Sequence, residues 1–352
     1  MSARKEVFGT TKDGQEAHLY TLCDGGITAV VSDFGAVLVK LCVPDREGRM
    51  DDIVLGFDDL AGYERNPSCF GATVAPVANR IAGASFVIDG VEYHLPVNEG
   101  PNNLHSDKMS YRRLYDTALG ENSVTFSLRM ADGESGFPGN RDMAVTYTVT
   151  KDSLRIDYRI TTDRETYLNP TNHTYFNLAG QGSGTIDAQI LRLACSHYTP
   201  CGEGLIPTGE IRSVEGTPFD FRRPKAIAAD LHTEDTSKNH PDLVVTGGYD
   251  HNFVIDGWKG DGQEILFAEV TDPASGRRME VSTDMPGVQL YIAHGMYTEG
   301  CKGGRACGSR SGFCLETQCF PDTPHHDNFP SDLYGPARPL VSATTFRFPG
   351  AE

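Results

Sequence analysis

The sequence predicts an all-β protein built mainly from antiparallel strands. Two observations carry this prediction: apolar and polar residues alternate over many short segments, and glycine is frequent between them, at 38 of 352 residues. A period of two puts successive side chains on opposite faces of a strand. Helical patterns are too few to supply the alternating strands and helices of a parallel α/β fold.

Strand candidates cover the whole chain. Those with the most regular alternation lie at residues 124–130, 143–149 and 154–160. Further candidates lie near residues 30, 40, 268 and 290 and in the final TTFRF run. Short strands joined at intervals of about 8 to 12 residues by Gly-rich turns indicate a large sandwich or a barrel-like stack of sheets.

Local turn and helix signals complete the expected elements. Asp89 and Gly90 separate two alternating runs and suit a type I′ hairpin turn. We expect one turn of helix in residues 58–66 and another beginning at Pro224, because proline fits the first helical position. Residues 232–243 are interpreted as a surface loop rather than a linker, so residues 1–352 are expected to form one domain.

Composition excludes several classes of function. With 31 Lys and Arg against 48 Asp and Glu, the chain has a net charge of −17 and lacks the basic surplus that holds a nucleic acid. No run approaches the roughly 20 apolar residues that cross a bilayer, and the first residues do not resemble a signal peptide. We therefore expect no nucleic-acid or membrane partner, and a cytoplasmic protein whose nine cysteines are free thiols.

Two clusters invite a metal interpretation, and we expect neither to bind a metal. Cys301, Cys307, Cys314 and Cys319 are spaced more widely than the paired ligands of a structural zinc site. The run from His325 to Asp327 offers the two histidines and carboxylate of an iron oxygenase, but adjacent strand residues point to opposite faces. A solvated loop is the simpler interpretation of that run.

Two polar runs are the main candidates for chemistry. NPTNHTYFNLAG surrounds His173 with asparagines, and GFCLETQCFPD places Glu316 among apolar residues. On a strand, Glu316 would share one face with Cys314 and Gln318. Each residue also has a structural alternative, because a single histidine is often a satisfied structural residue and a strand glutamate often faces solvent.

Four other positions add polar groups of mixed type: Asn79 with Arg80, His105, Asp250 and Gln289. Taken singly, most are explained by turn chemistry. Taken together, they offer the paired donors and acceptors that a neutral polyol needs, with few charges of one sign.

In order and spacing, six motifs resemble the galactose mutarotase (aldose 1-epimerase) family over nearly the full length: GATVAPVANRIAG, NNLH, NPTNHTYFNLAG, YDHNF, GVQLYIA and GFCLETQCFPD. The resemblance implies a large antiparallel β-sandwich of the supersandwich type with few short helices. It further implies an open sugar cleft, no cofactor and no metal. We expect a sugar as the partner and a monomer or weak homodimer.

The resemblance also assigns roles. His173 matches the family's general acid and Glu316 its general base. Positions that bind sugar hydroxyls correspond to Arg80, His105, Asp250 and Gln289, with Asn79 beside them and Tyr175 in the cleft wall. Ser106 and Asp107 depart from the pair of glycines that usually follows NNLH, and residues 232–248 and 301–311 look peculiar to this chain.

The implied reaction is the interconversion of α and β anomers of free aldohexoses such as galactose and glucose. Ionised Glu316 would take the anomeric hydroxyl proton while protonated His173 protonates the ring oxygen. Mutual attraction is expected to raise the His173 pKa and lower the Glu316 pKa. Two alternatives remain open at this point: a mutarotase of hexose 6-phosphates and a non-catalytic carbohydrate-binding protein.

Overall fold

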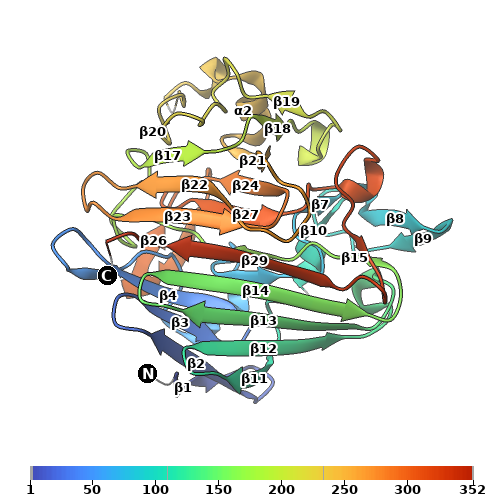
Figure 1. Ribbon diagram of the computed structural model, residues 1–352, viewed down its shortest axis with the longest axis horizontal. Helices are drawn as coiled ribbons and strands as arrows, with labels where there is room; N and C mark the ends of the chain where they lie inside the picture. Colours follow the sequence, from blue (N-terminus) through green and yellow to red (C-terminus); the bar gives the residue numbers. More distant parts are fainter. Residues whose placement is uncertain (1–2, 109, 233, 351–352) are drawn as a thin grey trace.

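The computed structural model describes residues 3–108, 110–232 and 234–350, and within them strands dominate the ribbon (Figure 1). Every ladder between two named strands is antiparallel in these residues. The strands form three larger sheets and several two-stranded ladders. This arrangement confirms the predicted all-β, antiparallel fold class.

The first sheet comes from the N-terminal part of the chain and has the strand order β1-β2-β3-β4-β5. Its strands are β1 (Arg4–Thr10), β2 (Glu16–Cys23), β3 (Thr28–Ser32), β4 (Val37–Pro44) and β5 (Met50–Asp52). The runs predicted near residues 30 and 40 are β3 and β4.

The largest sheet has nine strands among the described residues, in the order β11-β12-β13-β14-β29-β23-β22-β17-β20. Its members are β11 (Asp116–Leu119), β12 (Ser123–Met130), β13 (Arg141–Val149), β14 (Ser153–Thr162), β17 (Ile190–Leu193), β20 (Lys225–Ala226), β22 (Ile265–Thr271), β23 (Arg278–Thr283) and β29 (Leu340–Arg347). The three most regular runs are β12, β13 and β14, and the C-terminal strand β29 is paired on both sides.

The third sheet carries part of the candidate site and has the order β19-β18-β21-β24-β27. Its members are β18 (His197–Thr199), β19 (Arg212–Ser213), β21 (Asp250–Val254), β24 (Gly287–Tyr291) and β27 (Cys314–Gln318). In its register Gln289 lies opposite Glu316 and Tyr291 opposite Cys314. The strand order therefore sets side by side three runs that are far apart in the sequence.

Short elements connect these sheets. The two-stranded ladders are β6 (Ala72–Val74) with β16 (Thr171–His173), β7 (Arg80–Ile81) with β10 (Asn103–Leu104), β8 (Ser85–Ile88) with β9 (Val91–His94), β15 (Thr166–Tyr167) with β28 (Leu333–Tyr334), and β25 (Thr298–Cys301) with β26 (Arg305–Cys307). The α-helices among the described residues are α1 (Leu60–Arg65) and α2 (Pro241–Thr246). Neither they nor the 3₁₀ turns in these residues are long and apolar enough to cross a bilayer.

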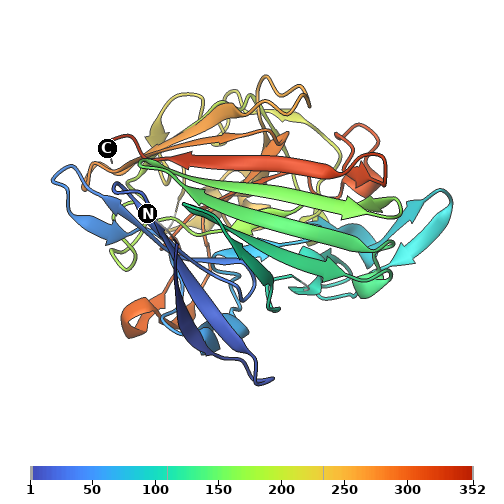
Figure 2. The ribbon, with the colours of Figure 1, turned by 60° about the horizontal axis from the view of Figure 1, so that its bottom comes forward.

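The main core cluster draws on all three larger sheets. Figure 2 shows the N-terminal sheet, in blue, below the long green strands of the nine-stranded sheet. Tyr20 of β2 meets Phe126 of β12 edge to face, with ring centroids 5.6 Å apart. Val31 and Val145 are fully buried in the same cluster. Removing such apolar surface from water supplies the main driving force for folding, and here it joins the two sheets.

Most local predictions are confirmed, and two are wrong. Asp89 and Gly90 have φ values of 50° and 78°, as a type I′ turn requires, and helix α1 lies within residues 58–66. No helix begins at Pro224, because residues 225–226 form the edge strand β20. The expected loop at 232–243 is wrong at its end, where α2 starts at Pro241; Thr233 lies outside the described residues.

Candidate active site

A cavity of about 390 Å³ opens beside the third sheet and collects most of the predicted site residues. Seven of the eight line it: Asn79, Arg80, His105, His173, Tyr175, Asp250 and Glu316. The eighth, Gln289, is buried behind the wall and donates from Nε2 to Oδ1 of Asp250 over 2.7 Å. Its contact there is with Asp250 rather than with the cavity.

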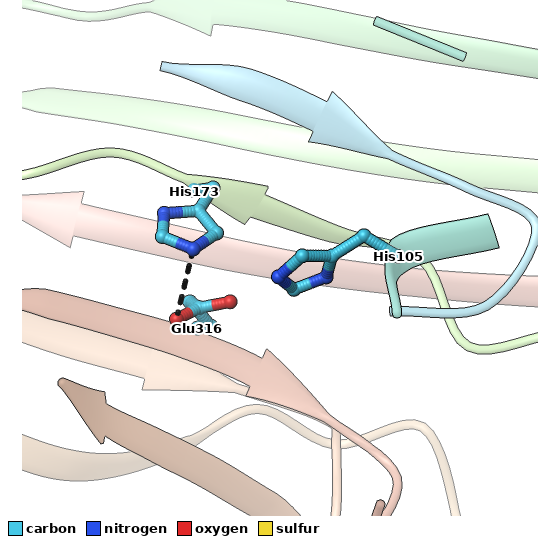
Figure 3. Close-up of side chains that lie close together, drawn as sticks. All are labelled: His105, His173 and Glu316. Carbon is cyan, nitrogen blue, oxygen red and sulfur yellow. Dashed lines mark ion pairs between the residues drawn. The ribbon is translucent and has the colours of Figure 1, made fainter. Parts of the chain in front are cut away.

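Two of the buried residues that line the cavity form a histidine–glutamate pair. His173 ends strand β16 and Glu316 is the central residue of β27, and these two strands are linked by the Thr171 hydroxyl, which donates to the carbonyl of Thr317 over 2.9 Å. The Nε2 atom of His173 lies 3.6 Å from Oε1 of Glu316. Figure 3 shows this contact, with the His105 ring also pointing toward the pair.

Burial sets the protonation of this pair and reverses the expected direction of both shifts. Only 8% of the His173 side chain and 3% of the Glu316 side chain are exposed. Loss of hydration lowers the pKa of His173 to about 4. Loss of hydration, with the charge of Asp250, raises the pKa of Glu316 well above its usual value. Desolvation therefore outweighs the mutual attraction expected from the sequence, and it favours the uncharged form of each partner, a neutral imidazole and a carboxylic acid.

His105 is fixed in one tautomer by its neighbour Asn79. The backbone N–H of Asn79 donates to Nδ1 of His105 over 3.0 Å, and the backbone N–H of His105 donates to the Asn79 carbonyl over 3.1 Å. Because Nδ1 accepts this hydrogen bond, the neutral ring carries its own hydrogen on Nε2. Burial lowers the pKa of His105 and keeps it neutral. The residue thus offers the cavity a single N–H donor.

The loop behind His105 has the left-handed backbone conformation that glycine favours. Ser106 and Asp107 have φ values of 50° and 54°, in the left-handed region that favours glycine. The buried Ser106 hydroxyl donates to the carbonyl of Val77 over 2.7 Å and accepts from the N–H of Val77 over 2.9 Å. These two hydrogen bonds hold the loop in the strained conformation, so the departure from glycine leaves His105 at the cavity.

Arg80 is held by a residue that the sequence did not single out. Its Nε and Nη2 atoms donate to the two carboxylate oxygens of Glu99 over 2.6 and 2.7 Å. A bidentate contact of this kind fixes the plane of the guanidinium group. One terminal nitrogen, Nη1, remains for a ligand, and the positive charge is largely balanced within the protein.

The sequence is similar to known proteins over nearly its whole length. Residues 18–337 match the family model described as aldose 1-epimerase. The chain belongs to the aldose 1-epimerase family. Similar curated relatives include the galactose mutarotase of Pongo abelii, 39% identical over 99% of this chain and 98% of the relative, and the aldose 1-epimerase of Escherichia coli K12, 32% identical over 97% and 98%.

Solved structures of aldose 1-epimerases show the same fold. An aldose epimerase homologue from C. elegans superposes with a TM-score of 0.84 at 29% identity, covering 94% of this chain and 98% of its own. A galactose 1-epimerase from Lactobacillus acidophilus superposes with a TM-score of 0.83 at 24% identity, covering 98% of each chain. The resemblance stated from six motifs is thus confirmed.

Some cavity residues of this aldose 1-epimerase were missed from the sequence. Tyr291, His294, Met296 and Tyr297 line the outer wall, and Tyr297 is 70% exposed at the rim. Tyr291 lies within the GVQLYIA motif and His294 comes directly after it. Because Tyr291 is two residues from Gln289, strand periodicity could have placed both on one face. Met296 and Tyr297 lie in an irregular segment without a periodic pattern, so only the tertiary structure could place them.

Among the described residues, the group that could supply metal ligands differs from the two clusters considered in the sequence. His105, His173 and Glu316 offer ligand atoms that lie within 4.8 Å of one another. His105 fits poorly as a ligand, because a metal on its Nε2 needs the hydrogen on Nδ1, where Asn79 donates instead. His325 and His326 both contact Asp322 rather than Asp327, and all nine cysteines are reduced thiols.

Proposed function

We propose that this protein is an aldose 1-epimerase that interconverts the α and β anomers of free aldohexoses such as galactose and glucose. The observation that carries the proposal is the buried pair of His173 and Glu316, 3.6 Å apart on the floor of a polar cavity. An acid and a base in reach of one hemiacetal suffice to open and close a pyranose ring. Full-length similarity to galactose mutarotases supports the same assignment.

The reaction uses the single proton that the pair holds. With sugar bound, the proton moves from Glu316 to Nε2 of His173, leaving a carboxylate and an imidazolium. Glu316 then removes the proton from the anomeric hydroxyl while His173 protonates the ring oxygen, and the C1–O5 bond breaks to give the aldehyde. Rotation about C1–C2 and closure with the roles reversed produce the other anomer.

The other side chains bind and orient the sugar. The fixed N–H of His105, the free Nη1 of Arg80 and the carboxylate of Asp250 supply donors and an acceptor for ring hydroxyls. Gln289 positions Asp250, and its own carbonyl accepts from Nε2 of Gln318 over 3.1 Å. Tyr175 stacks on the His173 ring at a centroid distance of 5.1 Å and forms part of the wall.

The charges around the cavity favour free sugars over hexose 6-phosphates. Arg80 is the one arginine or lysine among the lining residues, and Glu99 neutralises it. The basic residues Arg222 and Lys225 pair with Asp220 and Asp230 and do not line the cavity. A dianionic phosphate would therefore meet no unpaired cation of the lining.

The test is polarimetry of freshly dissolved α-D-galactose and α-D-glucose, with their 6-phosphates as the comparison. We expect acceleration of the free sugars in a buffer that catalyses mutarotation weakly, and much slower turnover of the phosphates. Faster turnover of the phosphates would favour the sugar-phosphate alternative. Saturable binding of galactose without acceleration would make the protein a carbohydrate-binding protein.

The pKa shifts predict a broad pH profile. Below about pH 4 a second proton enters the pair at His173, so no group can take the proton from Glu316 and activity is lost. At high pH the pair loses its single proton, and this limb is displaced upward because the pKa of Glu316 is raised. Measuring kcat/KM from pH 3.5 upward, with buffer catalysis subtracted, checks this, and an acid limb at the ordinary histidine value near 6.5 would contradict it.

Arg80→Ala is expected to weaken sugar binding more than chemistry. Loss of a charged donor should raise KM by about 10- to 100-fold with a smaller change in kcat. Arg222→Ala is the matched control, because Arg222 is also paired with a carboxylate but lies outside the cavity. An unchanged KM in the Arg80 variant would show that the guanidinium does not bind the sugar.

A further inference from the structure

Strand β27 contacts both nitrogens of His173 with side chains from one of its faces. Glu316 approaches Nε2, and the sulfur of Cys314 lies 3.5 Å from Nδ1. Residues two apart on a strand share a face, so the period of the strand delivers the two groups to opposite edges of one ring. The side chains of Cys314 and Glu316 are both buried. The function proposed above uses Glu316 and leaves Cys314 without a role.

Aromatic rings pack around the His173 ring and restrict its orientation. Tyr175 stacks on it, and His105 and Tyr291 meet it edge to face at centroid distances of 5.3 and 6.3 Å. The His173 carbonyl, which also contacts the ring, already accepts a hydrogen bond from the N–H of Gly71 over 3.0 Å. The titratable or charged groups that face the ring are Cys314 and Glu316 from β27, Asp250 from β21, Tyr291 from β24, His105 from its 3₁₀ turn, and Tyr175.

Proton counting determines which way the Cys314 contact runs. Burial favours the uncharged forms of both His173 and Glu316. A neutral ring whose Nε2 is to accept the proton of Glu316 carries its own hydrogen on Nδ1. That hydrogen faces the Cys314 sulfur, which is a weak acceptor. Burial also raises the pKa of the Cys314 thiol, so the acceptor is uncharged. The neutral sulfur of Cys314 therefore favours the Nδ1–H tautomer of His173. Unlike a carboxylate at the same place, it does not strongly stabilise the imidazolium.

We propose that Cys314 is a positioning residue of the epimerase reaction: its sulfur accepts the Nδ1 hydrogen of His173 and keeps Nε2 as the nitrogen that exchanges a proton with Glu316 and the sugar. The inference rests on the proposed function and deepens it. Without the sulfur, the Nε2–H tautomer competes, and that form cannot receive the proton of Glu316.

Three variants test this role by kinetics. Cys314→Ala should lower kcat by about three- to tenfold with KM within about twofold, as expected for loss of one weak hydrogen bond. Cys314→Ser retains an acceptor and should recover most of the lost kcat. Cys319→Ala removes a buried thiol just beyond the same strand without touching His173 and should match the wild type. Equal kcat in the wild type and Cys314→Ala, or equal loss in the alanine and serine variants, would overturn the proposal.

A second measurement is independent of turnover. In protein labelled with ¹⁵N-histidine, long-range ¹H–¹⁵N spectra report which ring nitrogen carries hydrogen, and the His173 signals are those missing from His173→Gln. We expect a protonated Nδ1 in the wild type and a growing Nε2–H population in Cys314→Ala. A wild-type ring protonated at Nε2 alone would refute the role of Cys314. Failure of the wild type to accelerate mutarotation would instead refute the proposed function.

Discussion

Glu316→Gln is expected to lower kcat for mutarotation by about 10³-fold while sugar still binds. The amide matches the carboxyl group in shape, but it can neither accept the anomeric proton nor deliver a proton to His173. Proton transfer by a positioned side chain contributes about 10²- to 10⁴-fold, and Glu316 takes part in both ring opening and closure. The measurement is polarimetry at saturating α-D-galactose, together with calorimetric titration of sugar binding.

Glu269→Gln is the matched control for this variant. Glu269 is also a strand glutamate, on β22, but it pairs with Arg192 at 2.7 Å and lies outside the cavity. It should retain wild-type kcat. Near-normal turnover in Glu316→Gln, with the control equally active, would remove Glu316 from the mechanism.

His173→Gln is expected to have the second-largest effect, a loss of about 10²- to 10³-fold in kcat. Glutamine keeps a hydrogen-bonding group near Glu316, so the cavity stays polar, but no group can then protonate the ring oxygen. The acid limb of the pH profile, assigned to His173, should disappear from the residual activity. His197→Gln, an exposed strand histidine, is the control and should behave as the wild type.

The His173 variant also separates catalysis from folding. His173 is buried against Tyr175 and His105, so its replacement tests packing as well as chemistry. Retained sugar affinity and an unchanged far-ultraviolet circular dichroism spectrum would show that the loss is chemical. Retention of the wild-type pH profile by a folded His173→Gln protein would contradict the acid role.

The strands were predictable wherever alternation is regular. Residues 124–130, 143–149 and 154–160 each bury one face, and the pattern that predicts them is the cause of that burial. Proline predicted helix starts less well than alternation predicted strands. Pro224 precedes an edge strand and Pro241 opens helix α2, and the same residue type suits both positions. Only the neighbours of Pro241, with a histidine cap before it and Leu243 buried behind it, distinguish the helix.

Most of the predicted residues that line the cavity could be picked out from motifs, whereas their pKa shifts and partners could not. The β8–β9 hairpin separates Arg80 from Glu99, and Glu99 lies in the irregular stretch after that hairpin, so no periodic signal predicts their contact. The pKa shifts of His173 and Glu316 were predicted in the wrong direction. Attraction between the two groups can be inferred from their motifs, whereas the loss of water around them depends on burial in the fold. The position of Gln289 behind Asp250 likewise depends on strand register.

The place of β29 in the nine-stranded sheet bears on how the protein is made. Strand β29, residues 340–347, lies between β14 and β23. It therefore joins one half of the sheet, β11 to β14, to the other half, which consists of β23, β22, β17 and β20. During synthesis, both neighbouring edges stay unpaired until these residues leave the ribosome. Open strand edges invite association with other chains. We therefore expect the nascent protein to complete its nine-stranded sheet only after residues 340–347 have been made, and to be most prone to association before that step.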